Sequence, residues 1–233
     1  MSAAEGAAAL LAACRQMFER GYTSSTGGNA SQRTPAGFLV SATGTSFGRL
    51  APGDLVECDL AGLPLRQGPA PSKEASFHAA IYRRRPDVRV VMHLHSAAAI
   101  ALSTLAEPTL DGNCLPVVTS YAATRVGRTP LLPYSPPGSQ ALAEAVAESC
   151  GEVNAILMQN HGLVTLGGTL DESVDIFEEF EQAAKVWLAT LGQARVLDDA
   201  ELALARPKPG TAVAPGTQRP RLRAGVRFGP GEP

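Results

Sequence analysis

The chain has 233 residues, enough for one domain with an appendage, and its 45% hydrophobic and 18% charged residues are typical of a globular protein. Residues 206–233 hold six basic residues and one acidic residue, which leaves 14 basic and 21 acidic residues and a charge of −7 in 1–205. This charge argues against nucleic acid as the main partner, and no apolar run approaches the ~20 residues that span a bilayer, so no membrane association is expected.

Amphipathic and alternating patterns predict the elements of the first half of the chain. In order, they are a helix over 5–21, a polar Gly-rich loop over 23–31, a short strand over 37–44, a helix over 71–86, a strand over 87–96 and a helix over 97–105. Gly21 supplies a C-terminal signal for the first helix, and Ser72 is the predicted N-cap of the second.

The second half continues without a regular βαβ rhythm. Its sequence patterns predict short β-like runs and turns over 114–138, a helix over 139–150, two strands around an Asn-His-Gly turn within 154–167 and a long helix over 169–192. Thr169 and Glu172 have the spacing of a capping box for the last helix. After a domain over 1–205, six prolines and few large apolar residues predict a disordered basic tail over 206–233.

The four cysteines are widely spaced and form no C-x-x-C pair. They indicate scattered reduced thiols, not a disulfide framework, and therefore predict a cytoplasmic protein.

Two of the four histidines lie in VVMHLHSAAA, residues 90–99. Because strand side chains alternate faces, His93 and His95 should point the same way, about 6.6 Å apart along the strand. Two neutral imidazoles on one face can bind a metal, but two histidines satisfied by hydrogen bonds explain an isolated H-x-H equally well.

Further ligands would have to come from elsewhere in the chain. His161 lies at a predicted strand end, and Gly162 allows a sharp turn there. Glu74 is the candidate fourth group, although the helix dipole explains a carboxylate in a first turn without any function. His78 follows one turn later on the same face, and spacing alone leaves it open as a ligand or a core residue.

Three loops carry groups that bind anions. These groups are Asn29 in TGGN, Thr43 and Gly44 in ATG, and Ser72 and Lys73 at a predicted helix N-terminus. Each is common in loops, so only their convergence beside a metal would indicate a phosphate site.

Taken in order, TGGNAS, SATGTS, PSKEASFH, VMHLHS and QNHG resemble the motifs of the class II aldolase/adducin family over about residues 8–200. The resemblance implies an α/β/α sandwich around a mainly antiparallel central sheet, assembled as a homotetramer with sites between subunits. It implies a divalent metal, typically zinc with manganese or cobalt as substitutes, bound by His93, His95 and His161. Glu74 would ligate the resting metal and act as the acid/base, and His78 would be structural.

Within the family, PSKEASFHAAIYRRRPD, VMHLHSAAAIALSTL and YAATRVGRTPLLPYSPPG are most similar to the branch that decarboxylates 3-oxo-tetronate 4-phosphates. This implies a carbon–carbon lyase that forms dihydroxyacetone phosphate and CO2 through a zinc-stabilised enediolate. Lys73 stands where the aldolases usually have a second serine, and Ala30 replaces a more usual valine or isoleucine. Tyr121, as a catalytic residue, and Arg125, as a substrate- and phosphate-binding residue, are candidate substrate-side groups in a loop that could reach a neighbouring subunit, although loop packing explains them equally well.

The same residues leave other activities open. A class II sugar-phosphate aldolase of the L-fuculose-phosphate type shares nearly all of them, and a 4-epimerase or a methylthioribulose-phosphate dehydratase would be further metal-dependent variants. A non-catalytic adducin-like interaction domain is the alternative from a different class, and such a domain need not retain the metal ligands.

Overall fold

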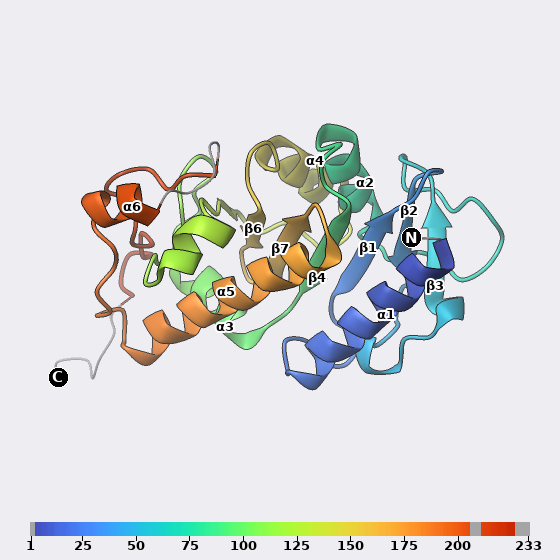
Figure 1. Cartoon of the computed structure of the whole chain (residues 1–233), viewed down its shortest axis with the longest axis horizontal. Coiled ribbons are helices and arrows are strands. Elements are labelled where there is room, and N and C mark those ends of the chain that lie inside the picture. The colour runs from blue at the N-terminus through green and yellow to red at the C-terminus, as the bar shows by residue number, and fades with distance from the viewer. Residues whose placement is uncertain (1–2, 206–210, 227–233) are drawn as a thin grey trace.

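A computed structural model describes residues 3–205 and 211–226, and a seven-stranded sheet forms its centre (Figure 1). The strands are β1 (Asn29–Arg33), β2 (Phe38–Ser41), β3 (Leu55–Cys58), β4 (Val90–Leu94), β5 (Leu131–Leu132), β6 (Ala155–Met158) and β7 (Gly162–Gly167). They lie in the order β3-β2-β1-β4-β7-β6-β5. Among these strands β5 and β6 pair in parallel and all other neighbours are antiparallel, which confirms the predicted mainly antiparallel sheet.

Helices cover both faces of the sheet, as predicted for an α/β/α sandwich. They are α1 (Ala3–Glu19), α2 (Ala75–Arg84), α3 (Ala97–Leu105), α4 (Gln140–Ser149), α5 (Leu170–Ala189) and α6 (Asp199–Ala205). α1, α3 and α5 pack on one face, and α2 and α4 on the other (Figure 1). Each face therefore has its own apolar core.

The central strand β4 contributes side chains to both cores, which explains its continuous apolar sequence. Met92 and Leu94 pack towards α1, α3 and α5, whereas Val91 packs towards α2 and α4. His93 shares the face of Val91 and meets the ring of Phe77 edge-on, with centroids 5.8 Å apart. The alternation of β4 thus directs His93 into the α2 side of the sheet.

The long helix α5 begins as the sequence predicts, with Thr169 as N-cap. The Thr169 side chain accepts a hydrogen bond from the Glu172 backbone N–H at 3.1 Å. The Glu172 carboxylate accepts from the backbone N–H of Gly168 at 2.8 Å, one residue before the partner that a capping box predicts. The helix start is therefore well capped, by a variant of the predicted pattern.

Two predicted boundaries differ from the structure. α2 begins at Ala75 with Glu74 as its N-cap, and the predicted cap Ser72 accepts a hydrogen bond from the Glu74 backbone N–H at 3.2 Å instead. The predicted loop over 23–31 already becomes strand β1 at Asn29. That strand has polar side chains, so its pairing with β2 and β4, not an apolar pattern, specifies it. β3 and α6 were not predicted.

Residues 211–226 of the basic tail also differ from the predicted disorder, because they pack against the domain. Leu222 forms a β-bridge with Ala106, and the carbonyl of Arg221 accepts a hydrogen bond from Glu107 at 2.7 Å. The guanidinium of Arg219 lies over the Trp187 ring, 5.1 Å from its centroid. Backbone hydrogen bonds, a cation–π contact and the burial of Val213 in one of the two cores hold this segment, so a few apolar residues are sufficient. The rest of the predicted tail, 206–210 and 227–233, lies outside the described residues.

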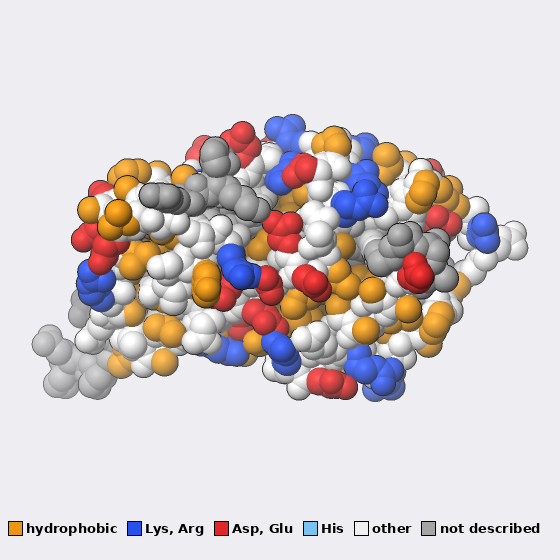
Figure 2. Space-filling model, viewed as in Figure 1, with side chains coloured by type: hydrophobic (Ala, Val, Ile, Leu, Met, Phe, Trp, Pro, Cys, Tyr) orange, Lys and Arg blue, Asp and Glu red, His pale blue; other side chains and the backbone are white. Residues whose placement is uncertain are grey.

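The surface over α1 and α5 carries interspersed acidic and basic side chains (Figure 2). None of the helices within the described residues is long and apolar enough to cross a membrane.

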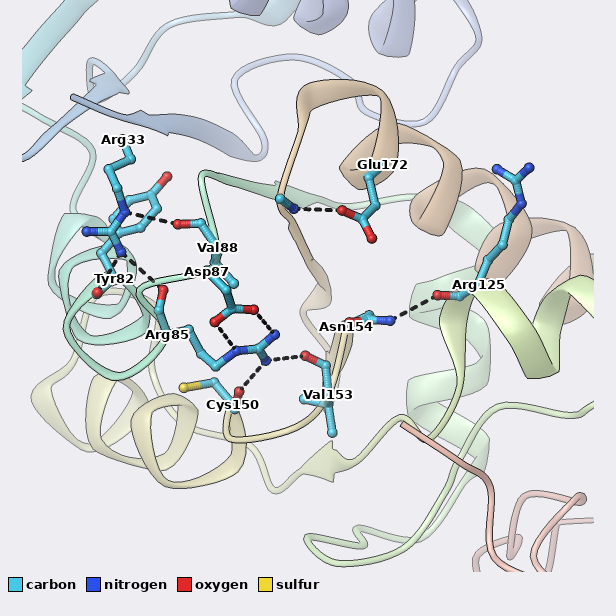
Figure 3. A network of polar contacts seen from close by, with 11 residues as sticks. Arg33, Tyr82, Arg85, Asp87, Val88, Arg125, Cys150, Val153, Asn154 and Glu172 are labelled. Carbon is cyan, nitrogen blue, oxygen red and sulfur yellow. Dashed lines mark hydrogen bonds and ion pairs between the residues drawn. The ribbon is translucent and has the colours of Figure 1, made fainter. Parts of the chain in front are cut away.

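The end of the sheet where β4 begins is closed by a polar network (Figure 3). The Arg85 guanidinium donates to both Asp87 oxygens, at 2.9 and 2.8 Å, and to the carbonyls of Cys150 and Val153. A cavity of about 470 Å³ lies beside this network, and none of the predicted site residues lines it. This network joins the end of α2 to the segment between α4 and β6.

Leu102 and Leu204 offer a matched test of the core. Leu102 is fully buried in α3, whereas the side chain of Leu204 in α6 is 79% exposed. Leu102→Ala should lower the free energy of unfolding by about 2–5 kcal/mol, and Leu204→Ala by no more than about 0.5 kcal/mol. Urea denaturation of both variants measures the difference, and equal losses would contradict the packing described.

Candidate metal centre

Three histidines from two strand ends bring one ligand atom each to a common point. His93 lies in β4, His95 directly follows β4, and His161 lies in the turn between β6 and β7. Their ligand nitrogens all lie within 4.8 Å of one another, and the Nε2 atoms of His93 and His95 are 2.8 Å apart. The predicted H-x-H pair and the histidine of the Asn-His-Gly turn therefore meet as expected.

Glycines allow this close approach of three backbone segments. A Cβ atom on Gly162 would lie 2.5 Å from the carbonyl oxygen of Leu94 and 2.8 Å from Cδ2 of His95. A Cβ atom on Gly27, in the loop before β1, would lie 3.0 Å from Nδ1 of His95. Any larger residue at 162 would push β7 away from the end of β4, and the histidines would separate.

The environment of the histidines keeps them neutral. Burial lowers the pKa of His93 well below its ordinary value, and the neighbouring His95 and His161 lower it further. Burial also lowers the pKa of His161 to about 4. His93 Nδ1 donates to the carbonyl of Leu163 at 3.0 Å, so its lone pair lies on Nε2, the atom that faces the other histidines.

Glu74 completes the cluster from the N-terminus of α2. Its Oε2 lies 3.3 Å from Nε2 of His93, and its Oε1 lies 3.4 Å from Nε2 of His161. The side chain is buried, and burial raises the pKa of its carboxyl, whereas a 2.8 Å hydrogen bond from the Asn29 amide opposes that rise. One carboxylate thus bridges two of the three imidazoles.

The chemistry of this donor set fits a divalent cation. Three neutral imidazole nitrogens and a carboxylate are a ligand set that zinc and related ions bind. A buried carboxylate also requires compensating charge or hydrogen bonds, and neutral histidines supply no positive charge. The three histidines could hold a metal ion, with Glu74 within reach.

His78, which the spacing left open as a ligand, has both ring nitrogens engaged elsewhere. Its Nδ1 lies 2.6 Å from the Ser31 hydroxyl, and its Nε2 lies 2.5 Å from Oδ1 of Asn29. The ring is fully buried. No lone pair of His78 is therefore available to a metal.

The candidate anion-binding groups adjoin the carboxylate to different extents. Asn29 bonds Glu74 directly, and Ser72 and Lys73 immediately precede it in the chain. Thr43, next to Gly44, is connected to this segment through a 3.0 Å backbone hydrogen bond to Ala70. The side chain of Lys73 and the segment 43–44 are exposed. Only Asn29 therefore contacts Glu74 through its side chain, and the other four groups belong to the segments that lead to it.

Tyr121 and Arg125 are not brought to the histidines of the same chain. Arg125 forms an ion pair with Asp175 of α5, and its guanidinium lies 5.0 Å from the centroid of the Tyr121 ring. Its carbonyl accepts from Asn154 just before β6 (Figure 3), whereas His161 follows the other end of that strand. Tyr121 is 55% exposed.

A buried acid that the sequence analysis missed contacts the segment that follows His95. Glu181 of α5 accepts hydrogen bonds from the Ser96 hydroxyl at 2.6 Å and from the Ala99 backbone N–H at 3.2 Å. It therefore caps α3, which begins just after His95. The signal available in the sequence was an acidic residue one turn after Phe177, on the apolar stripe of α5.

Comparison with known proteins identifies the family. Residues 8–188 match the Class II Aldolase and Adducin N-terminal domain, which is more than half of the chain. The chain belongs to this family. The five ordered motifs and the sandwich fold of the sequence analysis are thereby confirmed.

Individual relatives include both decarboxylases and aldolases. A Haemophilus influenzae protein named 3-oxo-tetronate 4-phosphate decarboxylase is 40% identical over 191 residues, which is 81% of this chain and 90% of that protein. An Escherichia coli L-fuculose phosphate aldolase is 32% identical over 195 residues, 82% of this chain and 87% of that protein. The solved structure of Klebsiella pneumoniae YgbL, for which aldolase, epimerase or decarboxylase activity has been suggested, superposes with a TM-score of 0.81. It is 34% identical and covers 88% of this chain and 100% of that one.

Acid should destabilise the metal-free protein. Unfolded histidines take up protons as pH falls through about 6.5, whereas burial holds the pKa of His161 at about 4 and that of His78 at about 3 in the folded chain. The unfolded state then binds more protons, so the free energy of unfolding should fall by at least about 2 kcal/mol between pH 7 and pH 5. Urea denaturation across this range measures the loss.

Other groups do not obscure this test. The raised pKa of Glu74 acts in the opposite sense, but four histidines with lowered pKa values outnumber it. The pKa of Asp87 is lowered by its hydrogen bonds to Arg85, and the stability this contributes is lost only below its ordinary value of 3.8. A free energy of unfolding that stays level or rises towards pH 5 would contradict the buried neutral histidines.

Proposed function

We propose that this protein is a metal-dependent decarboxylase that converts 3-oxo-tetronate 4-phosphate to dihydroxyacetone phosphate and CO2. The observation that carries the proposal is the set of five relatives, 33–40% identical to this chain, that are named 3-oxo-tetronate 4-phosphate decarboxylase. The histidine and carboxylate cluster supports it, because loss of CO2 from a 3-oxo acid needs stabilisation of negative charge and a proton donor.

His93, His95 and His161 would hold the ion, with zinc as the proposed metal and manganese or cobalt as substitutes. Neutral nitrogen ligands leave the full double charge on such a cation, and imidazole suits all three metals. When bound, the ion supplies Lewis-acid stabilisation of negative charge on the substrate oxygens. Glu74 would be a further ligand of the resting centre and, when not bound to the ion, would be available for proton transfer.

The reaction breaks the bond between C1 and C2 of the substrate. C1 leaves as CO2, and its bonding electron pair stays on C2, conjugated with the C3 carbonyl. The protonated Glu74 carboxyl would deliver one proton to C2, which gives dihydroxyacetone phosphate. Burial raises the pKa of this carboxyl, which is the direction that a general acid requires.

The phosphate would bind along the rim formed by Asn29, Thr43, Gly44, Ser72 and Lys73. Lys73 is the cation of this rim, and its ammonium group suits either the phosphate or the leaving carboxylate of the substrate. Binding the phosphate at a fixed distance from Glu74 would orient C2 for protonation. A sugar-acid phosphate carries both anions, so Lys73 would pair with one of them.

We further propose a cytoplasmic homotetramer in which Tyr121 and Arg125 reach the site of a neighbouring subunit. Tyr121 is exposed and stacks with Arg125, so the pair forms a preassembled polar and aromatic group at the surface. The four cysteines are unpaired and buried, which is compatible with a reducing compartment.

A class II sugar-phosphate aldolase is the second candidate function. The relatives named L-fuculose phosphate aldolase, 32% identical to this chain, favour it. Both reactions place negative charge next to a substrate carbonyl, so the same ligands and the same carboxyl serve each. A non-catalytic interaction domain has less support, because such a domain has no need to converge three neutral histidines and a carboxylate.

The proposal predicts CO2 and dihydroxyacetone phosphate in equal yields from 3-oxo-tetronate 4-phosphate and the zinc-loaded protein. Glu74→Gln should lower the rate by about 10²–10⁴-fold, because the amide retains the shape of the carboxyl but cannot transfer the proton. Leu204→Ala, far from the rim and exposed, is the control and should retain activity.

If neither C2 epimer of the substrate releases CO2, the decarboxylase proposal is wrong. Cleavage of ketose 1-phosphates to dihydroxyacetone phosphate and an aldehyde would then identify the aldolase.

A further inference from the structure

A continuous hydrogen-bonded chain runs from the centre into the core behind it. From Oε2 of Glu74 it passes to the Asn29 amide (2.8 Å), to His78 (2.5 Å), to the Ser31 hydroxyl (2.6 Å) and to the Tyr82 hydroxyl (2.8 Å). All five side chains are buried. Neither the assignment of the metal ligands nor that of the phosphate rim explains why His78, Ser31 and Tyr82 are polar.

We propose that this hydrogen-bonded chain has one fixed direction, in which every group donates a hydrogen bond towards Glu74. We further propose that it holds the Glu74 carboxylate in place next to the three histidines. Asn29, His78, Ser31 and Tyr82 are then positioning residues of Glu74. The inference rests on the proposed function for the role of Glu74, but the direction of the chain can be established without any activity.

The geometry of the two elements explains how such a chain can form. Glu74, His78 and Tyr82 recur every four residues along α2, a rise of about 6 Å. Asn29 and Ser31 recur every two residues along β1, a rise of about 6.8 Å. The two rises nearly match, so the polar side chains of the helix and of the strand alternate along the hydrogen-bonded chain. Each polar group of one element thus finds a partner on the other.

The far end of the chain gives its direction. The Tyr82 hydroxyl has one proton, and its possible acceptors are the Ser31 oxygen at 2.8 Å and the Arg89 carbonyl at 3.5 Å. The shorter contact is the stronger hydrogen bond, so Tyr82 donates to Ser31. Ser31 must then use its own single proton towards Nδ1 of His78.

The remaining directions follow from the single proton of a neutral imidazole. Burial lowers the pKa of His78 to about 3, so the ring is neutral and carries its proton on Nε2 when Nδ1 accepts. Nε2 donates to Oδ1 of Asn29, which turns the amide nitrogen towards Oε2 of Glu74. An amide nitrogen has two protons, so Asn29 retains one for a substrate group.

Aromatic packing fixes the rings of this chain. The His78 imidazole stacks on the Phe77 ring, with the centroids 4.6 Å apart and an angle of 14° between the ring planes. The Phe38 ring is nearly parallel to the imidazole, with the centroids 6.5 Å apart. Arg33 lies over the Tyr82 ring at 4.7 Å and donates to the Tyr82 carbonyl at 2.6 Å (Figure 3). A chain held so rigidly can hold a carboxylate at a fixed place.

The direct test is the tautomer of His78 in the metal-free full-length protein. Correlation spectra of ¹⁵N-labelled histidine distinguish a proton on Nε2 from a proton on Nδ1. The proposal requires the Nε2–H form in the wild type. An Nδ1–H form would mean that the chain runs away from Glu74 and would overturn the inference, whatever the enzyme catalyses.

Ser31→Ala tests the positioning role, with Ser41→Ala as its matched control. Both serines are buried on neighbouring strands and each makes hydrogen bonds, but the Ser41 hydroxyl accepts from the Ala30 backbone and lies outside the chain. Ser31→Ala should weaken zinc binding, measured by competition with a chromogenic chelator, on the order of tenfold, as loss of an outer partner of a ligand does. Ser41→Ala should stay within about twofold of the wild type.

Tyr82→Phe removes the last donor and keeps the ring, so it should act in the same direction as Ser31→Ala. In the zinc-loaded enzyme both variants should lower kcat several-fold while KM changes little. Equal zinc affinities for Ser31→Ala, Tyr82→Phe and Ser41→Ala would overturn the positioning role. A wild type with the Nε2–H tautomer and the expected zinc affinities but no CO2 release would refute only the proposed function.

Discussion

Burial of the Glu74 carboxylate against uncharged imidazoles is the constraint on which the rest of the site depends. An ionised carboxylate removed from water costs several kcal/mol unless a cation or hydrogen-bond donors compensate it. Among the described residues no lysine or arginine forms an ion pair with it. A divalent ion between the histidines would supply the missing charge, and Asn29 supplies one donor. The site therefore couples metal binding to the stability of the surrounding fold.

The sheet order brings these groups together from distant parts of the chain. β1, β4 and β7 are neighbours, so Asn29 pairs with His93, and His93 pairs in turn with Val164 of β7. α2 then lies over β1, where its four-residue repeat meets the two-residue repeat of the strand. Two independent periodicities thus position Glu74, one from strand pairing and one from helix packing.

The sequence could predict the features that local pattern determines and not those that tertiary packing determines. The helix that became α5 and the face shared by His93 and His95 follow from periodicity and needed no partner. Strand β1 was missed because its side chains are polar and its pairing is non-local. The role of His78 as a ligand or a core residue could not be decided from spacing, since its partners Asn29 and Ser31 lie far away in the chain. Composition alone predicts disorder for residues 211–226, because it carries no information about the backbone hydrogen bonds that hold this segment.

The metal centre is tested most directly by the metal content of the purified full-length protein, determined by mass spectrometry beside that of a His93→Ala variant. We expect about one divalent ion per chain in the wild type and a loss of that ion in the variant, with the variant still folded by circular dichroism. A folded wild type that binds no divalent ion when supplied with zinc, or a His93→Ala variant that retains the ion with unchanged affinity, would contradict the metal centre.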